Sequence, residues 1–165
     1  MADKTVVYCW DTSVFLAWLG EETGAPLANI ELVIDEIDKS LAVLLVPVTA
    51  YSEVLEFNNT PKKMEKFRKF LERSNIIVAD VTKAIAEKAG EIRSRGLAAK
   101  PKRKIKTPDA TFMATAIIFR ADVFHTCETE QLPNLSGTSI VDKLKICSPG
   151  PISGHRALTG LPGTS

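Results

Sequence analysis

The sequence predicts an α/β fold of three layers, with helices on both faces of a central, mostly parallel sheet of four or five strands. Short continuous apolar runs alternate along the chain with longer segments in which apolar residues recur at helical spacing, and this alternation indicates strand–helix–strand units. The short runs show no polar alternation, which is typical of parallel strands buried on both faces. The chain has 165 residues, of which 45% are hydrophobic and 25% charged, so it is long enough to bury one core.

The first strand is expected over residues 5–10, a continuous run that contains two valines, a tyrosine and a tryptophan. The run stops at Asp11, and Thr12 or Ser13 is expected to cap the short helix that follows. The next elements are predicted from apolar residues at helical spacing and from one further apolar run. They are expected over residues 27–41 (helix), 42–46 (strand), 49–57 (helix) and 61–72 (helix).

The second half of the chain continues this alternation. Thr82 is expected to cap one helix, and Thr107 is expected to cap another that has Pro108 at its first position. Between these two helices, residues 96–106 are rich in Gly, Pro and Lys and are interpreted as a linker. The expected ranges are 75–79 (strand), 82–95 (helix), 107–120 (helix), 123–126 (strand) and 144–147 (strand).

We expect a single domain over residues 1–148 and a Pro- and Gly-rich tail over residues 149–165 that lies on the surface or is mobile. No apolar run approaches the ~20 residues of a membrane-spanning helix, and the N-terminus lacks the pattern of a secretory signal. Cys9, Cys127 and Cys147 are an odd number at wide spacings, which fits neither a disulfide framework nor a zinc site. These features predict a cytoplasmic protein with reduced thiols and no membrane partner.

Charge is segregated along the chain, although the net charge is only +1. Residues 1–59 hold 10 acids and 2 bases, residues 60–106 hold 5 acids and 15 bases, and residues 107–165 hold 5 acids and 4 bases. Such segregation indicates a basic surface beside an acidic one, either as a solvated helical surface or as a site for a polyanion.

Four acids fall at or just after predicted strand ends, or at the starts of helices that face those ends. Ligands of open parallel sheets collect at the carboxyl ends of the strands, and grouped carboxylates stay ionised at neutral pH only with a cation between them. Oxygen ligands without Cys or His favour Mg²⁺ or Mn²⁺. Each acid alone has a structural alternative, as a helix cap or as a charge on a solvent-exposed face. The four are Asp11, Glu53, Asp109 and Glu128.

Four segments resemble the motifs of PIN domains, in the same order and at similar spacing. Residues 7–13 (VYCWDTS) resemble the opening of the domain, a hydrophobic strand followed by Asp and a hydroxyl-bearing residue. Residues 46–54 (VPVTAYSEV) resemble the second motif, and residues 106–116 (KTPDATFMATA) are similar to the third, which is the most specific. Residues 126–128 (TCE) stand where the family usually has Thr-x-Asp. The resemblance covers about residues 5–148.

The resemblance implies a metal-dependent ribonuclease that hydrolyses RNA phosphodiester bonds with one or two Mg²⁺ or Mn²⁺ ions. By their positions in the motifs, Asp11, Glu53 and Asp109 would be the catalytic residues and core metal ligands. Glu128 would be the fourth ligand in place of the family's usual Asp, and Glu130 competes for that position. The hydroxyls that would support the metal-bound water or the substrate phosphate are those of Ser13 and Thr126.

A run of cations immediately precedes the third motif, and a second basic cluster lies within residues 62–69. Phosphate contacts give RNA affinity without sequence information, so we expect the run to bind RNA beside the carboxylates. The structural alternative is a flexible surface loop with no bound partner. The candidate RNA-binding residues are Lys100, Lys102, Arg103, Lys104 and Lys106.

Many small PIN domains resemble VapC toxins, which an antitoxin restrains and which often dimerise, so the resemblance implies an antitoxin partner and a homodimer. Apolar side chains of the helices predicted over residues 49–57 and 61–72 would form either such a surface or part of the core. Two other functions stay open: a PIN scaffold that binds RNA or protein without cutting, and a phosphoryl-transfer enzyme of another α/β family. Ser13 argues against the latter, since a haloacid-dehalogenase-type motif carries a second Asp there, and the sequence has no P-loop.

Overall fold

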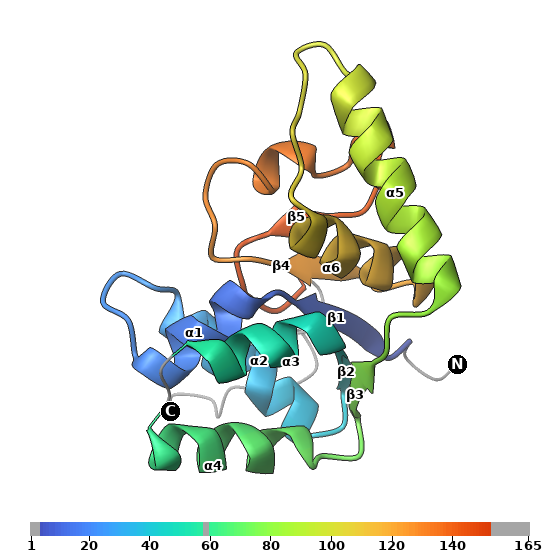
Figure 1. The fold of residues 1–165 in the computed structure, drawn as a ribbon. Coiled ribbons are helices and arrows are strands. Elements are labelled where there is room, and N and C mark those ends of the chain that lie inside the picture. Colours follow the sequence, from blue (N-terminus) through green and yellow to red (C-terminus); the bar gives the residue numbers. More distant parts are fainter. Residues whose placement is uncertain (1–3, 58–59, 153–165) are drawn as a thin grey trace, which may run out of the picture.

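In a computed structural model, the chain folds around a five-stranded sheet in which all neighbouring strands are parallel (Figure 1). The strands are β1 (Val6–Trp10), β2 (Ala42–Pro47), β3 (Ile76–Ala79), β4 (Val123–His125) and β5 (Ile146–Cys147). The structure describes residues 4–57 and 60–152. The strand order is β3-β2-β1-β4-β5, so the first strand of the sequence lies in the middle of the sheet. There Tyr8 is opposite Leu44 on one side and Val123 on the other.

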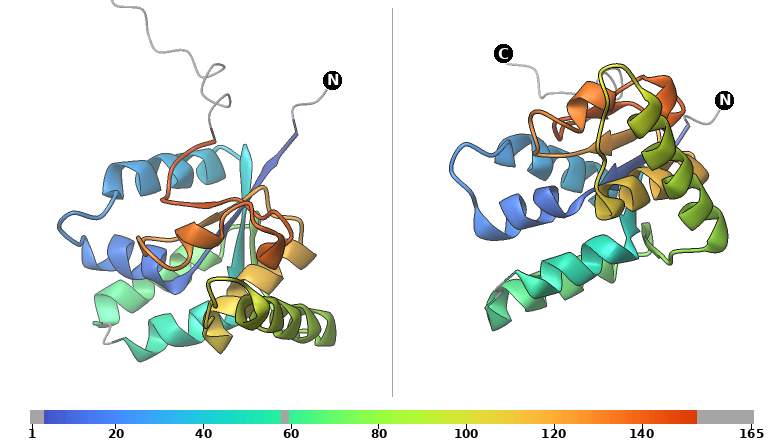
Figure 2. Two further views of the ribbon diagram at one scale, coloured as in Figure 1. Left: turned by 90° about the horizontal axis from the view of Figure 1, so that it is seen from above. Right: turned by 45° about the horizontal axis from the view of Figure 1, so that its top comes forward.

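Helices cover both faces of the sheet, which confirms the predicted three-layer α/β/α architecture. The described residues form α1 (Thr12–Gly20), α2 (Leu27–Asp38), α3 (Val48–Glu56), α4 (Pro61–Leu71), α5 (Lys83–Ala98) and α6 (Thr107–Ile118), with short 3₁₀ turns η1 (Pro133–Leu135) and η2 (Ser139–Val141). Helices α1, α2 and α4 cover one face of the sheet, whereas α5 and α6 cover the other (Figure 2). None of the helices in the described ranges is long and apolar enough to cross a membrane.

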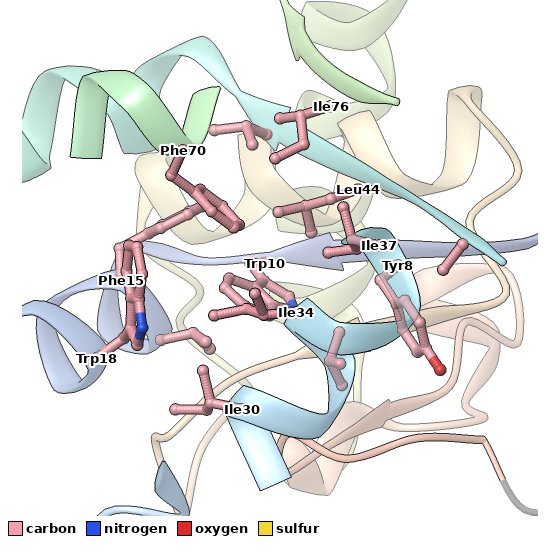
Figure 3. Packing of buried hydrophobic residues seen from close by; sticks show 14 of the residues in the cluster. Tyr8, Trp10, Phe15, Trp18, Ile30, Ile34, Ile37, Leu44, Phe70 and Ile76 are labelled. Atoms are coloured by element: carbon pink, nitrogen blue, oxygen red, sulfur yellow. The ribbon is translucent and has the colours of Figure 1, made fainter. Parts of the chain in front are cut away.

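One face of the sheet carries an aromatic core, part of which Figure 3 shows. Phe70 of α4 lies in this core, with its ring centroid 6.1 Å from that of Trp10, 6.4 Å from that of Phe15 and 4.9 Å from that of Trp18. Trp10 ends β1, and the other two rings belong to α1. Aromatic contacts of this kind stabilise the packing beyond the area that they bury. The cluster therefore holds α1, which follows the end of β1, against α4.

The opposite core joins the sheet to α5 and α6. Cys9, Leu45 and Phe124 point to this face from three neighbouring strands, and the residues beside them in β1 and β2 point to the aromatic core. Ile92 of α5 and Met113 of α6 are fully buried against them. This packing anchors α6, whose first turn contains the third motif, on the sheet.

The N-terminus of α1 differs from the prediction. Asp11, and not Thr12 or Ser13, is the N-cap, and its carboxylate accepts a hydrogen bond from the Val14 N–H at 3.4 Å. The two hydroxyls instead donate to carboxylates. The physical reason is that a carboxylate at the end of β1 reaches the unpaired N–H groups of the first helical turn. One residue therefore ends the strand and caps the helix.

At α6 the predicted cap is also wrong. Thr107 is the first helical residue and not the cap, so Lys106 occupies the N-cap position without a side-chain hydrogen bond. At α5 the prediction is confirmed, because the Thr82 hydroxyl accepts a hydrogen bond from the Ile85 N–H at 3.2 Å. This helix runs to Ala98, past the end expected from the sequence.

The segment after α5 is not a free linker, because it runs back along that helix (Figure 1). We call residues 100–106 the basic strap. The Arg103 N–H donates to the Gly96 carbonyl at 2.8 Å, and Nε of Arg93 donates to the Ile105 carbonyl at 3.1 Å. The side chain of Ile105 is buried. These contacts hold the cations of the strap in place beside α5.

We expect Gly96→Ala to destabilise the protein by about 1–2 kcal/mol, because the added Cβ would lie 2.7 Å from the Arg103 carbonyl oxygen. Gly90→Ala is the matched control in the same helix, since its Cβ would meet nothing within 4 Å. There the helix preference of Ala over Gly should stabilise the protein by about 0.5–1 kcal/mol. Urea unfolding of the two variants should therefore show shifts of opposite sign, and equal stability of both would contradict the close approach at Gly96.

The tail predicted over residues 149–165 begins against the core. Pro149 is buried, and the Ile152 N–H donates to the Tyr8 hydroxyl at 3.1 Å. That hydroxyl in turn donates to the Glu36 carboxylate at 2.7 Å. The rest of the predicted tail lies outside the described residues.

Candidate active site

Four carboxylates that are far apart in the sequence line one cavity of about 410 Å³. They are those of Asp11, Glu53, Asp109 and Glu128. One follows β1, one lies on the helix after β2, one is in the first turn of α6 and one follows β4. Because these strands are parallel, the segments that follow them emerge at one edge of the sheet. The structure therefore brings together all four acids that the sequence singles out.

Asp11 is the most buried of the four acids, with 4% of its surface exposed. The Ser13 hydroxyl donates to its carboxylate at 2.5 Å, accepts from the Cys127 N–H at 2.9 Å, and lies 3.4 Å from the Thr126 hydroxyl. Burial raises the pKa of Asp11 to about 6; the charge of Asp109 adds to this effect, and hydrogen bonds from the two hydroxyls oppose it. Both predicted supporting hydroxyls thus lie beside Asp11.

Glu53 and Asp109 face the same cavity from two helices. Oγ1 of Thr12 donates to Glu53 at 2.5 Å, which ties the start of α1 to α3. Burial raises the pKa of the Asp109 carboxyl, the Lys106 ammonium lowers it, and the charges of Glu53 and Glu128 raise it further. Lys106 also lines the cavity. The acids therefore repel one another across a cavity that contains one ammonium group.

Glu128 lines the cavity, but backbone N–H groups engage both of its oxygens. Oε1 accepts hydrogen bonds from Glu130 at 3.0 Å and from Gln131 at 2.7 Å, and Oε2 accepts one from Leu132 at 2.7 Å. Although partial burial opposes the effect, these donors lower the pKa of Glu128. Glu130, the alternative fourth acid, does not line the cavity. Glu128 therefore holds the turn over residues 128–132 in addition to contributing charge.

The donor set suits a hard divalent cation, since all four side chains offer carboxylate oxygens. Burial and mutual repulsion raise the pKa of Asp11 and Asp109, and a cation between such groups relieves the repulsion. In their present positions, no three His, Cys, Asp or Glu side chains within the described ranges form a ready ligand set.

The nearby imidazole and thiol groups are unsuited to acid–base or nucleophilic chemistry. His125 is 1% exposed, and its Nδ1 accepts a hydrogen bond from the Trp10 indole at 3.2 Å. Burial lowers the pKa of His125 to about 4, so the ring is neutral at pH 7. Cys9, Cys127 and Cys147 are free thiols, and burial raises the pKa of Cys127 to about 11. The chemistry of the cavity is therefore that of its carboxylates and hydroxyls.

The basic strap lies directly beside this acidic cavity. Lys102, Arg103 and Lys104 line a second cavity of about 260 Å³. Lys106 lines the acidic cavity itself, and Lys100 is exposed where the strap begins. The two cavities share lining residues from α6 and from the turn after β4. Cations and carboxylates thus occupy one continuous surface.

Two polar residues of the cavity wall, Thr12 and Gln131, are not predicted as site residues from the sequence. The sequence suggests only a capping role for Thr12, whereas in the structure its hydroxyl donates a hydrogen bond to the Glu53 carboxylate. Its signal in the sequence is that two hydroxyl residues, and not one, follow Asp11. Gln131 has no local signal, because its position depends on the bond between its N–H and the carboxylate of Glu128.

A parallel sheet covered by helices on both faces, with acids gathered where the strands end, defines the class of fold to which PIN domains belong. The sequence model of the PIN domain matches residues 8–135. The chain therefore belongs to the PIN domain family, whose members are generally nucleases. No curated protein matches the chain.

Several solved structures share this fold. VapBC2 from Rickettsia felis, bound to a DNA fragment from their promoter, has a chain that is 16% identical, with a TM-score of 0.61 over 86% of this chain and 97% of that chain. FitAcB from Neisseria gonorrhoeae is similar at 16% identity and a TM-score of 0.57, with the same coverage. A toxin–antitoxin complex from Klebsiella pneumoniae is similar at 17% identity and a TM-score of 0.56, over 88% of this chain and 99% of that chain. These likenesses show the fold.

Proposed function

We propose that the protein is a metal-dependent endoribonuclease that hydrolyses RNA phosphodiester bonds with Mg²⁺ or Mn²⁺. The observation that supports this function best is the gathering of Asp11, Glu53 and Asp109 around one cavity that adjoins the basic strap. Carboxylates alone would repel a phosphate, so a site for RNA needs cations both within it and around it. Membership of a family of nucleases adds to this support.

In the proposed reaction, Asp11, Glu53 and Asp109 would hold the cation. When bound, such an ion lowers the pKa of a water molecule and neutralises charge that develops on the phosphate. Ser13 and Thr126 would keep the Asp11 carboxylate oriented, because their hydroxyls meet beside it.

Two further residues shape the proposed phosphate site. Lys106 would contact a phosphate oxygen, since its side chain lines the acidic cavity and lysine is a compact cation well suited to phosphate. Glu128 would hold the turn over residues 128–132 through the hydrogen bonds that it accepts from three backbone N–H groups. We assign Glu128 mainly this positioning role, because its oxygens are already engaged.

The experiment that tests this function incubates end-labelled RNA with the purified protein and Mg²⁺ or Mn²⁺, with and without a chelator. We expect cleavage that requires the ion, because the grouped carboxylates would repel the phosphate unless a cation lies between them. Cleavage that continues in excess chelator would contradict the metal-dependent mechanism. Failure to cut any RNA with either ion would contradict the nuclease assignment itself.

A second candidate function is a PIN scaffold that binds RNA or protein with weak or no cleavage. Two observations favour it: the engaged oxygens of Glu128 and the lack of a ready ligand set within the described ranges. Filter binding separates the two functions, since a scaffold would retain RNA without metal-dependent cleavage.

We further propose that the protein is a cytoplasmic toxin with an antitoxin partner and that it forms a homodimer. The structural neighbours from toxin–antitoxin systems support the partner. Leu55 and Phe57, at the end of α3, are 42% and 55% exposed, whereas Phe67 and Phe70 belong to the core. Because Phe57 also lines the acidic cavity, a protein that covered it would restrict access to the carboxylates. The molar mass in solution tests the dimer, and a monomeric mass at high concentration would exclude it.

A further inference from the structure

The cavity beside the basic strap differs in chemistry from the acidic one. Its lining includes apolar side chains that are no more than 7% exposed, namely Ile105, Leu132 and Leu135. Around them lie the cations Lys102, Arg103 and Lys104. Phosphate contacts require the cations only, so the apolar part of the lining suits a second kind of group. Sites for small ligands commonly combine such an apolar lining with a few polar groups.

The two cavities are contiguous. Asp109, Gln131 and Leu132 line both of them. An RNA strand with one phosphate among the carboxylates would therefore place the neighbouring nucleoside over the second cavity. At about 260 Å³, that cavity is slightly smaller than the ~300–1,000 Å³ of pockets for drug-sized ligands, which suits a single nucleoside.

We propose that this second cavity binds one nucleoside of single-stranded RNA, next to the phosphate that is hydrolysed. This inference rests on the proposed ribonuclease function and adds a base-binding subsite to it. An unstacked base would lie against the apolar residues, and the strap cations would contact the flanking phosphates. A duplex would be excluded, because a paired and stacked base does not enter such a cavity.

Gln131 is the residue that we expect to determine the preferred base. Its side chain is exposed and lines both cavities, and an amide can both donate and accept hydrogen bonds at a base edge. Its backbone is held in place, because its N–H donates to the Glu128 carboxylate at 2.7 Å. The buried Leu132 beside it is held by the same carboxylate. A fixed backbone presents the amide at the boundary between the two cavities.

The first test compares cleavage sites in a pool of RNAs of random sequence. We expect the wild type to prefer one base beside the cut, and Gln131→Ala to weaken that preference about fivefold, the effect of one hydrogen bond of about 1 kcal/mol. This variant keeps the backbone bond to Glu128. Asn134→Ala is the matched control, since Asn134 is exposed on η1 and lines neither cavity. An identical base preference in the wild type and in Gln131→Ala would overturn the proposal and leave the nuclease assignment intact.

The second test does not depend on cleavage, so it separates failure of the subsite from failure of the proposed function. NMR spectra of the isotope-labelled protein are recorded with the four nucleoside 5′-monophosphates and with ribose 5-phosphate. We expect amide shifts confined to residues 102–105 and 131–135 with at least one nucleotide, and weaker shifts in Gln131→Ala. Equal shifts with ribose 5-phosphate would show recognition of phosphate alone and overturn the proposal. Shifts elsewhere, or none at millimolar nucleotide, would overturn it as well.

Discussion

Asp11→Asn is expected to reduce metal-dependent RNA cleavage by about a hundredfold or more. The amide oxygen of Asn can still accept the hydrogen bonds that Ser13 and Val14 donate to Asp11, so the local structure should persist. The substitution removes the most buried negative charge of the cavity. Initial rates of cleavage of labelled RNA in Mn²⁺ measure the effect. Asp35→Asn is the control, because Asp35 pairs with Lys39 on the exposed side of α2.

The same substitution is expected to stabilise the protein at neutral pH in the absence of divalent ions. Burial raises the pKa of Asp11 from 3.8 to about 6, so the native state binds this proton more tightly than the unfolded chain does. The resulting stabilisation is fully present below about pH 4 and is lost as the pH rises through about 6. The loss amounts to about 2–3 kcal/mol for a shift of this size. Because Asn carries no charge, the variant avoids this loss of stability.

Urea unfolding of the wild type and of Asp11→Asn, across this pH range and with a chelator present, measures the difference. The wild type should become less stable relative to the variant as the pH rises. A variant that is less stable than the wild type at neutral pH would show that the carboxylate has a stabilising partner other than the hydroxyls and N–H groups named above.

For the cleavage assay, chelator-sensitive cleavage that survives in the variant would place the metal site elsewhere.

Reversal of charge in the basic strap, with Lys102→Glu and Arg103→Glu together, is expected to weaken RNA binding about tenfold to a hundredfold at low salt. Both side chains line the cavity beside the carboxylates. The double variant loses two cations that release counterions from RNA, so the slope of log affinity against log salt should fall by about 2. Filter binding in an Asp11→Asn background measures affinity while the RNA stays intact.

The matched control for this experiment reverses Lys39 and Lys83, which changes the net charge equally. Both side chains are exposed, one at the end of α2 and the other at the start of α5. If the strap binds RNA, this control should retain most of the affinity. An equal loss in both double variants would indicate a response to net charge and remove the strap from the proposed interface.

The order and type of the helices and strands are readable from the sequence because they depend on local patterns. The apolar run that becomes β1 has to be buried on both sides, whatever packs against it. Pro61 and Thr82 mark helix starts through their own backbone and hydroxyl chemistry. The location of the acids can also be predicted, since the carboxyl ends of parallel strands lie at one edge of the sheet.

The roles of individual side chains depend on partners that are distant in the sequence. Asp11 caps α1 and also lies beside Thr126, more than a hundred residues away. Glu128 stands where the motif predicts a fourth ligand, yet the turn that follows it supplies three N–H groups to its oxygens. Whether such a carboxylate binds a metal or accepts hydrogen bonds from a turn depends on which groups lie within bonding distance of its oxygens. Sequence spacing does not encode these distances.

The sequence alone therefore determined the parallel α/β architecture, the family and the set of acids, because apolar periodicity and motif order are properties of the chain itself. Only the tertiary structure decided that the basic segment runs back along α5 and that Gln131 lies between two cavities. Both depend on hydrogen bonds and close contacts between separate segments, such as that of Arg103 with Gly96. Such contacts join segments that the packed core holds side by side.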